Sequence, residues 1–237
     1  MGRRFSAVLA AGLLCAFSGT ARSEDATADR PNVLIIGDSI SIGYMKPLES
    51  LLQGKAVVVH NPGNAAHSGK GLENIEAWLG DTQWDVIHFN HGLHDLKYVD
   101  DAGKNVASKE LGHIQIPLEQ YAKNLEAIVD RLKKTGAKLI FATTTPFPEK
   151  PDGPLREVAD VTRYNEAALE IMKRHEVAID DLYTFALPRL TEIQIPKNVH
   201  FTEEGSKVLA QEVARHIEAA LGIAEATATS EQDSKAK

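Results

Sequence analysis

The sequence predicts an α/β protein: a three-layer α/β/α domain on a parallel sheet of about five strands. Two observations support this fold class. Short apolar runs of strand length recur along the chain, and segments with apolar residues at helical spacing separate them. No repeat and no second domain interrupts this alternation. Strands that alternate with helices form parallel sheets that are covered on both faces.

A serine lies between the first predicted strand and the first predicted helix. Val33–Ile36 is a continuous apolar run, which is typical of a strand buried on both faces. Gly37 ends the run, Asp38 and Ser39 follow, and an amphipathic helix begins near Ser41. A serine in that position lies at the C-terminal edge of the sheet, where open α/β sheets bind ligands. The helix N-terminus also offers N–H groups to a developing negative charge.

The remaining elements continue the alternation. We expect further strands over residues 56–60, 85–90, 138–145 and 177–179. We expect helices over residues 69–79, 117–135, 155–175 and 203–221, with a helical turn in 181–190. Pro117 and Gly136 are a typical start and stop for the third helix. Residues 98–116 are expected to be a loop, whose length indicates an active-site surface.

The two ends of the chain differ from this domain, which we place at residues 31–222. Residues 1–23 have the pattern of a secretory signal peptide: Arg3 and Arg4, an apolar stretch over 5–17, and small residues around Arg22. The apolar stretch is too short to span a bilayer, so we expect no stable membrane anchor. Residues 24–30 are expected to be a flexible lead-in and residues 223–237 a disordered tail. The predicted location is therefore outside the cytoplasm, either periplasmic or secreted.

Charge and cysteine usage exclude several classes of function. The net charge is −7, and loss of the signal peptide would make it −10, because that segment holds three arginines and no acid. Such a chain is not expected to bind nucleic acid or an anionic membrane surface. The one cysteine, Cys15, lies in the signal peptide, so a thiol nucleophile is excluded.

Two motifs at opposite ends of the domain indicate the chemistry. Gly37-Asp38-Ser39 alone is an ordinary turn with a helix cap. However, Val199-His200-Phe201-Thr202-Glu203-Glu204-Gly205 precedes the last helix. A serine after the first strand and a histidine before the last helix resemble the SGNH (GDSL-type) hydrolases across nearly all of the domain. This resemblance implies a flavodoxin-like strand order.

The resemblance implies that Ser39 is the nucleophile and His200 its base. The family has an aspartate three residues before this histidine, but here that position is Lys197, which cannot accept a hydrogen bond. A backbone carbonyl or Asn198 would then orient the ring, or a carboxylate would come from elsewhere in the chain. A Ser–His dyad remains a plausible catalyst in each case.

The resemblance also implies an oxyanion hole with three donors. These are the Ser39 N–H, a backbone N–H from Ala65 (with Gly63 as the alternative), and His94 in place of the family's asparagine. The third block, normally G-x-N-D, is Gly92-Leu93-His94-Asp95 here. The expected supporting residues are Asp38, Asn90, Asp95 and Asn198.

A metal site is the competing interpretation of the histidines. His88, His91 and His94 repeat at three-residue spacing, with His60 and His67 nearby. Because His88 lies in a predicted strand, the three side chains should not converge. We therefore expect neither a metal nor a cofactor.

The sequence thus predicts an exported esterase that hydrolyses short-chain acyl esters, such as O-acetylated carbohydrates, through a Ser39–His200 dyad. The expected partner is a small-molecule or carbohydrate ester. Two alternatives remain open at this point. One is a carbohydrate-binding module that has lost catalysis, and the other is an acyltransferase that uses the same dyad.

Overall fold

The computed structural model describes Gly2 and residues 30–223. The rest of the predicted signal peptide, nearly all of the lead-in and nearly all of the tail lie outside these residues. One parallel sheet has the strand order β2-β1-β3-β6-β7. Its strands are β1 (Asn32–Ile36), β2 (Val57–His60), β3 (Val86–Phe89), β6 (Lys138–Ala142) and β7 (Ala178–Asp180). The predicted fold class is confirmed, including the flavodoxin-like strand order.

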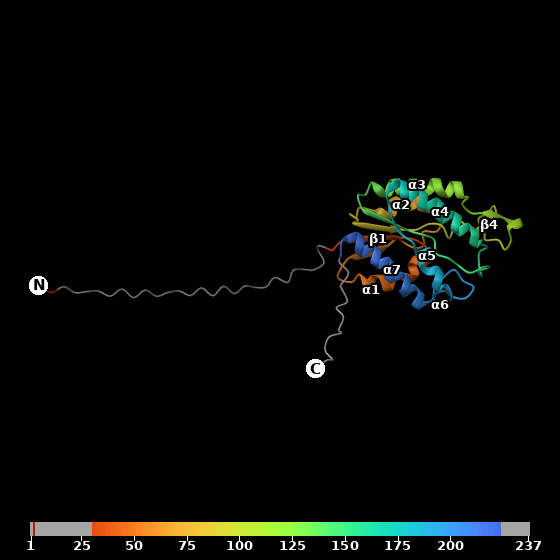
Figure 1. The fold of residues 1–237 in the computed structure, drawn as a ribbon. Coiled ribbons are helices and arrows are strands. Elements are labelled where there is room, and N and C mark those ends of the chain that lie inside the picture. Colours follow the sequence, from red (N-terminus) through yellow and green to blue (C-terminus); the bar gives the residue numbers. More distant parts are fainter. Residues whose placement is uncertain (1, 3–29, 224–237) are drawn as a thin grey trace, which may run out of the picture.

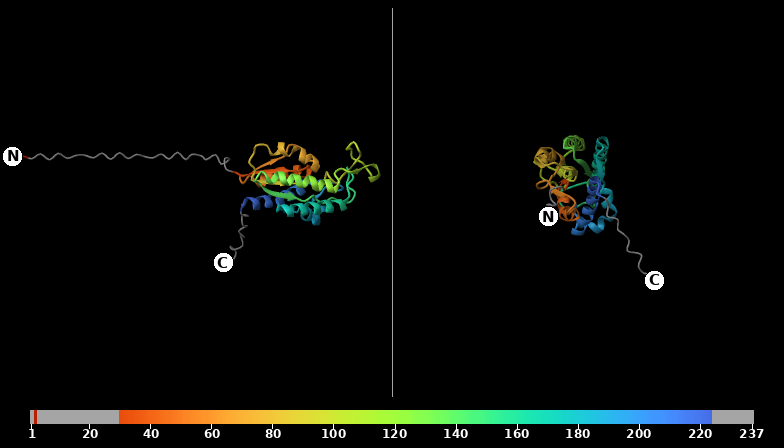
Figure 2. Two further views of the ribbon diagram at one scale, coloured as in Figure 1. Left: turned by 90° about the horizontal axis from the view of Figure 1, so that it is seen from above. Right: turned by 90° about the vertical axis from the view of Figure 1, so that its left-hand side faces the viewer.

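Helices cover both faces of the sheet (Figures 1 and 2). One layer holds α2 (Ser68–Leu79), α3 (Leu118–Lys133) and α4 (Val158–His175). The other holds α1 (Ser39–Leu51), α5 (Leu182–Ala186), α6 (Leu190–Ile193) and α7 (Glu203–Leu221), with the 3₁₀ turn Leu187–Arg189 between α5 and α6. Strand side chains alternate between the two cores: Leu34 and Ile36 face the first layer, whereas Val33 and Ile35 face the second. No helix in residues 30–223 combines the length and apolarity that a membrane crossing needs.

Most expected boundaries lie within two residues of the structure, and the larger differences are at three places. The helix expected over 155–175 begins at Val158. The fourth strand ends at Ala142 rather than at residue 145. The Thr143 N–H still donates to the carbonyl of Asp180 in β7 at 3.0 Å, but the next residue bonds outside the ladder. Thr144 donates its N–H to the Asn165 side chain at 2.8 Å. Residues 98–116 are not a plain loop: β4 (Tyr98–Val99) pairs antiparallel with β5 (His113–Ile114), and a 3₁₀ turn spans Lys109–Leu111. This hairpin extends from the end of the domain near α4 (Figure 1).

The start of α7 is fixed from two sides. The Thr202 hydroxyl accepts the N–H of Gly205 at 3.0 Å, and Glu203 and Glu204 place negative charge at the helix N-terminus. A side chain at Gly205 would collide with the carbonyl of Ile193 in α6. The segment between α6 and α7 is thereby held in place.

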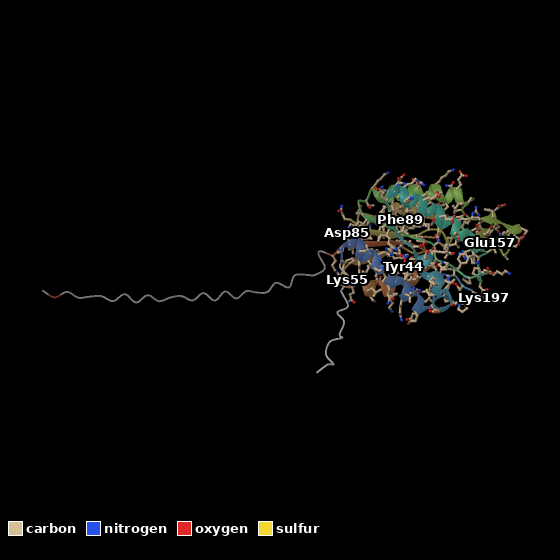
Figure 3. All side chains as sticks on the ribbon, in the orientation of Figure 1. Tyr44, Lys55, Asp85, Phe89, Glu157 and Lys197 are labelled. Atoms are coloured by element: carbon tan, nitrogen blue, oxygen red, sulfur yellow. The ribbon has the colours of Figure 1, made fainter. Side chains whose placement is uncertain are left out.

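The C-terminal edge of the sheet is the end that carries chemistry. The chain places β2 on one side of β1 and the later strands β3, β6 and β7 on the other side, so the strand order reverses between β1 and β3. Open α/β sheets bind ligands at such a switch point. In Figure 3, Lys55 and Asp85, which precede β2 and β3, lie at one end of the domain. Glu157 and Lys197, which belong to loops after β6 and β7, lie at the opposite end. The loops after β1, β3, β6 and β7 therefore meet at one edge.

Candidate active site

Ser39 is the first residue of α1, directly after the turn that follows β1. The Gly37 N–H donates to Oδ1 of Asn61 at 2.8 Å, and Asp38 Oδ1 caps the helix by accepting an N–H at 2.9 Å. A side chain at Gly37 would collide with Ser41, so this turn requires glycine. The turn holds Ser39 at the N-terminus of a 13-residue helix, where backbone N–H groups have no helical partner.

His200 faces Ser39 from the segment before α7. The distance from Ser39 Oγ to His200 Nε2 is 2.8 Å. Asn198 Oδ1 lies 2.7 Å from His200 Nδ1 and also accepts the His200 backbone N–H at 3.0 Å. Because a backbone N–H can only donate, it fixes which amide atom of Asn198 faces the ring. Nδ1 then carries the hydrogen, and Nε2 is free to accept the Ser39 proton.

A tight turn explains why the orienting group is Asn198 and not residue 197. The Asn198 N–H donates to the carbonyl of Ile195 at 3.0 Å, with Pro196 and Lys197 between them. Lys197 has φ 55°, as the third position of a type II turn requires. Of the three orienting groups considered from the sequence, the structure brings Asn198 to the ring. His200 Nδ1 is therefore bonded to Asn198 and not to a backbone carbonyl or a remote carboxylate.

The predicted oxyanion donor Ala65 needs a correction. Ala65 is fully buried and its N–H donates to the carbonyl of Gly37 at 3.0 Å, so this donor is already used. Gly63, the alternative, lies exposed in the preceding turn and lines a surface hollow beside Ile42. The next residue, Ala66, has φ 54°, an uncommon conformation for a residue other than glycine.

His94, from the third block, lies at the site. Its Nε2 is 3.9 Å from Asp38 Oδ2, and its side chain is 22% exposed. Burial, followed by the charges of Arg156 and Lys97, lowers the pKa of His94 to about 4. His94 is therefore neutral at physiological pH and offers one N–H donor.

The other expected supporting residues brace the edge of the sheet. Asn90 Nδ2 donates to the carbonyl of Ala142 at 2.7 Å, which joins the ends of β3 and β6. Asp95 Oδ1 accepts both the N–H (2.8 Å) and the hydroxyl of Ser68, the first residue of α2. Asp95 thus ties the loop after β3 to α2 and does not contact Ser39 or His200.

Asp95 gives a pH-dependent prediction for stability. Burial raises the pKa of Asp95 from 3.8 to about 7, and its Oδ2 has no partner. Between these values the folded protein keeps a proton that the unfolded chain has lost, so this group's contribution to stability falls as pH rises. Asp95→Asn removes the effect, because an amide stays neutral. Its free energy of unfolding relative to wild type should rise from pH 4 to pH 8 by up to about 4 kcal/mol.

Urea unfolding of both proteins across this pH range measures that difference. The exposed Asp81→Asn is the matched control, and its difference from wild type should stay flat. A flat difference for Asp95→Asn as well would contradict the assigned pKa.

The histidines do not assemble into one metal site. His88 Nε2 lies 3.0 Å from Asp180 Oδ2, whereas His91 Nδ1 is 3.4 Å from the carbonyl of Ala66 and His94 faces Asp38. Elsewhere, ligand atoms of Asp180, Glu212 and His216 lie within 4.8 Å of one another. There Arg215 Nη2 already donates to Glu212 at 2.6 Å and contacts His216 Nε2 at 2.8 Å, so a cation would have to displace a guanidinium.

Three residues of the site could not be found from the sequence. Asn61 holds Gly37, but in the sequence it is only one member of a turn cluster. Ala66 carries no signal of a left-handed backbone. Arg156 packs its own loop against Leu93, and an isolated arginine in a polar loop gives no sign of burial.

A buried strand, a serine at a helix N-terminus and an oriented histidine form the arrangement that serine hydrolases use. Residues 35–208 match the GDSL-like lipase/acylhydrolase family, and the chain belongs to this family of ester hydrolases. No curated protein matches.

Several solved structures share the fold. A lipase/acylhydrolase from Enterococcus faecalis has 18% identity and a TM-score of 0.65, over 80% of this chain and 96% of that one. The acetyl xylan esterase AlAXEase has 18% identity and a TM-score of 0.62, over 78% and 99%. Axe2, an acetylxylan esterase from Geobacillus stearothermophilus, has 18% identity and a TM-score of 0.64, over 79% and 94%.

Proposed function

We propose that this protein is an exported serine esterase that removes short acyl groups from esters, with O-acetylated carbohydrates as the substrate class. The observation that carries the proposal is the 2.8 Å contact between Ser39 Oγ and His200 Nε2, with the ring held by Asn198. Two structures that share the fold are acetyl xylan esterases, which supports a carbohydrate ester. The N-terminal pattern around Arg3 and Arg4 supports export, which N-terminal sequencing of protein from the cell envelope and medium would test.

The geometry supports a two-step reaction. Ser39 Oγ attacks the ester carbonyl carbon while its proton passes to His200 Nε2. The tetrahedral intermediate collapses, the alcohol leaves with that proton, and an acyl-Ser39 remains. Water then repeats the sequence with the same base, which releases the acid and restores the serine. Asn198 keeps Nδ1–H bonded throughout, so the ring stays oriented as Nε2 gains and loses the proton.

The oxyanion would form between the loops after β1, β2 and β3. The Ser39 N–H at the start of α1 is one donor, and neutral His94 is a second. We assign the third to the N–H of Ala66 in place of Ala65. This N–H now donates to the side chain of Asn64 at 2.8 Å, and Asn64 is an exposed residue whose side chain a substrate oxygen can replace.

A chain-length series tests the proposed activity. The purified protein should hydrolyse p-nitrophenyl acetate with a higher kcat/KM than p-nitrophenyl octanoate, by about tenfold or more. The physical reason is that no long apolar lid covers the site in residues 30–223. A fluorophosphonate probe should label Ser39 in the same preparation. Labelling without turnover of simple or sugar esters would favour an acyltransferase, and neither labelling nor turnover would favour a carbohydrate-binding module.

A further inference from the structure

Arg156 is a buried cation beside the candidate active site. It lies in the loop before α4, and only 6% of the residue is exposed. Its Nε donates to the carbonyl of Leu93 at 2.8 Å, and its Nη1 lies 3.4 Å from the carbonyl of Pro154. Leu93 directly precedes His94, so the guanidinium is held against the loop that carries His94, one of the proposed oxyanion donors.

Arg156 has no anionic partner. Both of its acceptors are neutral carbonyl groups, and within residues 30–223 no carboxylate oxygen lies within 4.0 Å of its guanidinium. Other arginines do pair: Arg131 with Glu76, Arg163 with Asp160, and Arg174 with Glu126. Burying a charge is costly unless an opposite charge or a ligand compensates it. A buried arginine that is left unpaired therefore needs an explanation.

Two further basic side chains, Lys97 and His94, lie within electrostatic reach of Arg156. Burial lowers the pKa of Arg156 to about 10, and its charge contributes to the lowered pKa values of both Lys97 and His94. Lys97 likewise has no carboxylate within 4.0 Å in the described part of the chain. The acid that acts on Arg156 is Asp38, which is itself buried and has a raised pKa because of that burial. Arg156 and Lys97 are thus two cations without a carboxylate partner within 4.0 Å in the described residues, in a chain whose net charge is −7.

Arg156 still has donors that a ligand can reach. Two of its five N–H groups face the carbonyls of Leu93 and Pro154. Nη2 has no hydrogen-bond partner within residues 30–223 and is not among the solvent-sealed, unpartnered atoms there, so its donors reach the surface. Arg156 also lines a surface hollow of ≈660 Å³, which has room for a sugar ring and whose other charged lining residues are Glu149, Lys150 and Glu157.

We propose that Arg156, with Lys97 as a second cation, binds an anionic group on the alcohol part of the ester, so that the preferred substrate is an O-acylated sugar acid. This inference rests on the proposed esterase function. The planar guanidinium fork matches a carboxylate in two parallel hydrogen bonds, and a sulfate presents similar oxygens. Arg156 is a specificity-determining residue in this account and takes no part in bond making or breaking.

Paired substrates test the inference. The first two are methyl glucoside and methyl glucuronoside acetylated at the same hydroxyl, and the third is the same acetylated glucoside carrying a 6-sulfate. Wild type should favour the glucuronoside over the neutral glucoside in kcat/KM by about tenfold or more, chiefly through a lower KM. Added salt should reduce this preference. The sulfated arm shows whether the subsite selects the carboxylate or any anion.

Variants separate recognition from bracing of the loop. Arg156→Gln should bring the ratio of kcat/KM for the acetylated glucuronoside to kcat/KM for the acetylated glucoside to about one. The largest change should be in KM for the glucuronoside. Arg163→Gln, a matched change at an exposed and paired arginine of α4, should keep the wild-type ratio. An equal loss on both esters, with the ratio kept, would overturn the inference and leave Arg156 as a brace.

The wild-type ratio decides the matter even if Arg156→Gln fails to fold. Wild type that hydrolyses both sugar esters equally refutes the anion subsite but leaves the esterase intact. Wild type that hydrolyses neither sugar ester nor p-nitrophenyl acetate refutes the proposed function itself.

Discussion

Replacement of Ser39 by alanine is expected to lower kcat/KM for p-nitrophenyl acetate by about 1,000-fold or more. The reason is that Ser39 Oγ is the atom that forms the acyl bond, and no neighbouring oxygen occupies the same place. His200→Ala should cost nearly as much, and the double variant should lose little more than either single one, because the two side chains act as one unit. Initial rates of the three variants under one set of conditions measure this.

Ser41 provides a matched control for that prediction. Its hydroxyl also contacts a histidine, His60 Nε2, at 2.7 Å, but Ser41 is buried at 4% exposure. Ser41→Ala should therefore keep most of the activity and lose only some stability. If Ser41→Ala abolished activity while Ser39→Ala retained it, the nucleophile would have been misassigned.

The fold could be predicted from the sequence because it depends on periodicity. Buried parallel strands produce continuous apolar runs, and amphipathic helices between them fix the direction of each connection. Boundaries were less accurate where side chains compete with the ladder, as at Thr144, which bonds to Asn165. The hairpin of β4 and β5 was missed because two-residue strands are too short to show a period.

The site was predictable only where its residues stand beside strong elements. Ser39 follows a buried strand and His200 precedes an evident helix, so pattern and resemblance located both. Ala66 differs, because its importance lies in a positive φ that alanine does not signal. Arg156 differs for another reason: whether a polar loop buries an arginine depends on a loop that is distant in sequence, here the one at Leu93.

Asn198→Asp is expected to move the acid limb of the kcat/KM profile to higher pH by about one unit. The carboxylate would keep both hydrogen bonds that Asn198 Oδ1 now accepts, from Nδ1 and from the backbone N–H of His200. Its negative charge would favour the protonated ring. The base would then stay protonated, and inactive, up to a higher pH. Asn198→Ala removes the orienting acceptor and should lower kcat/KM by about tenfold to 100-fold.

Lys197→Asp separates the structural assignment from the family pattern. Restoring an aspartate three residues before His200 would matter if that position faced the ring. In this structure Lys197 is exposed at the third position of the turn, and Asn198 already occupies Nδ1. Lys197→Asp should therefore shift the acid limb less than Asn198→Asp does. Profiles of wild type and the two variants, measured side by side at fixed ionic strength, give the comparison. A larger shift for Lys197→Asp would mean that the turn rearranges and that residue 197, not Asn198, orients the base.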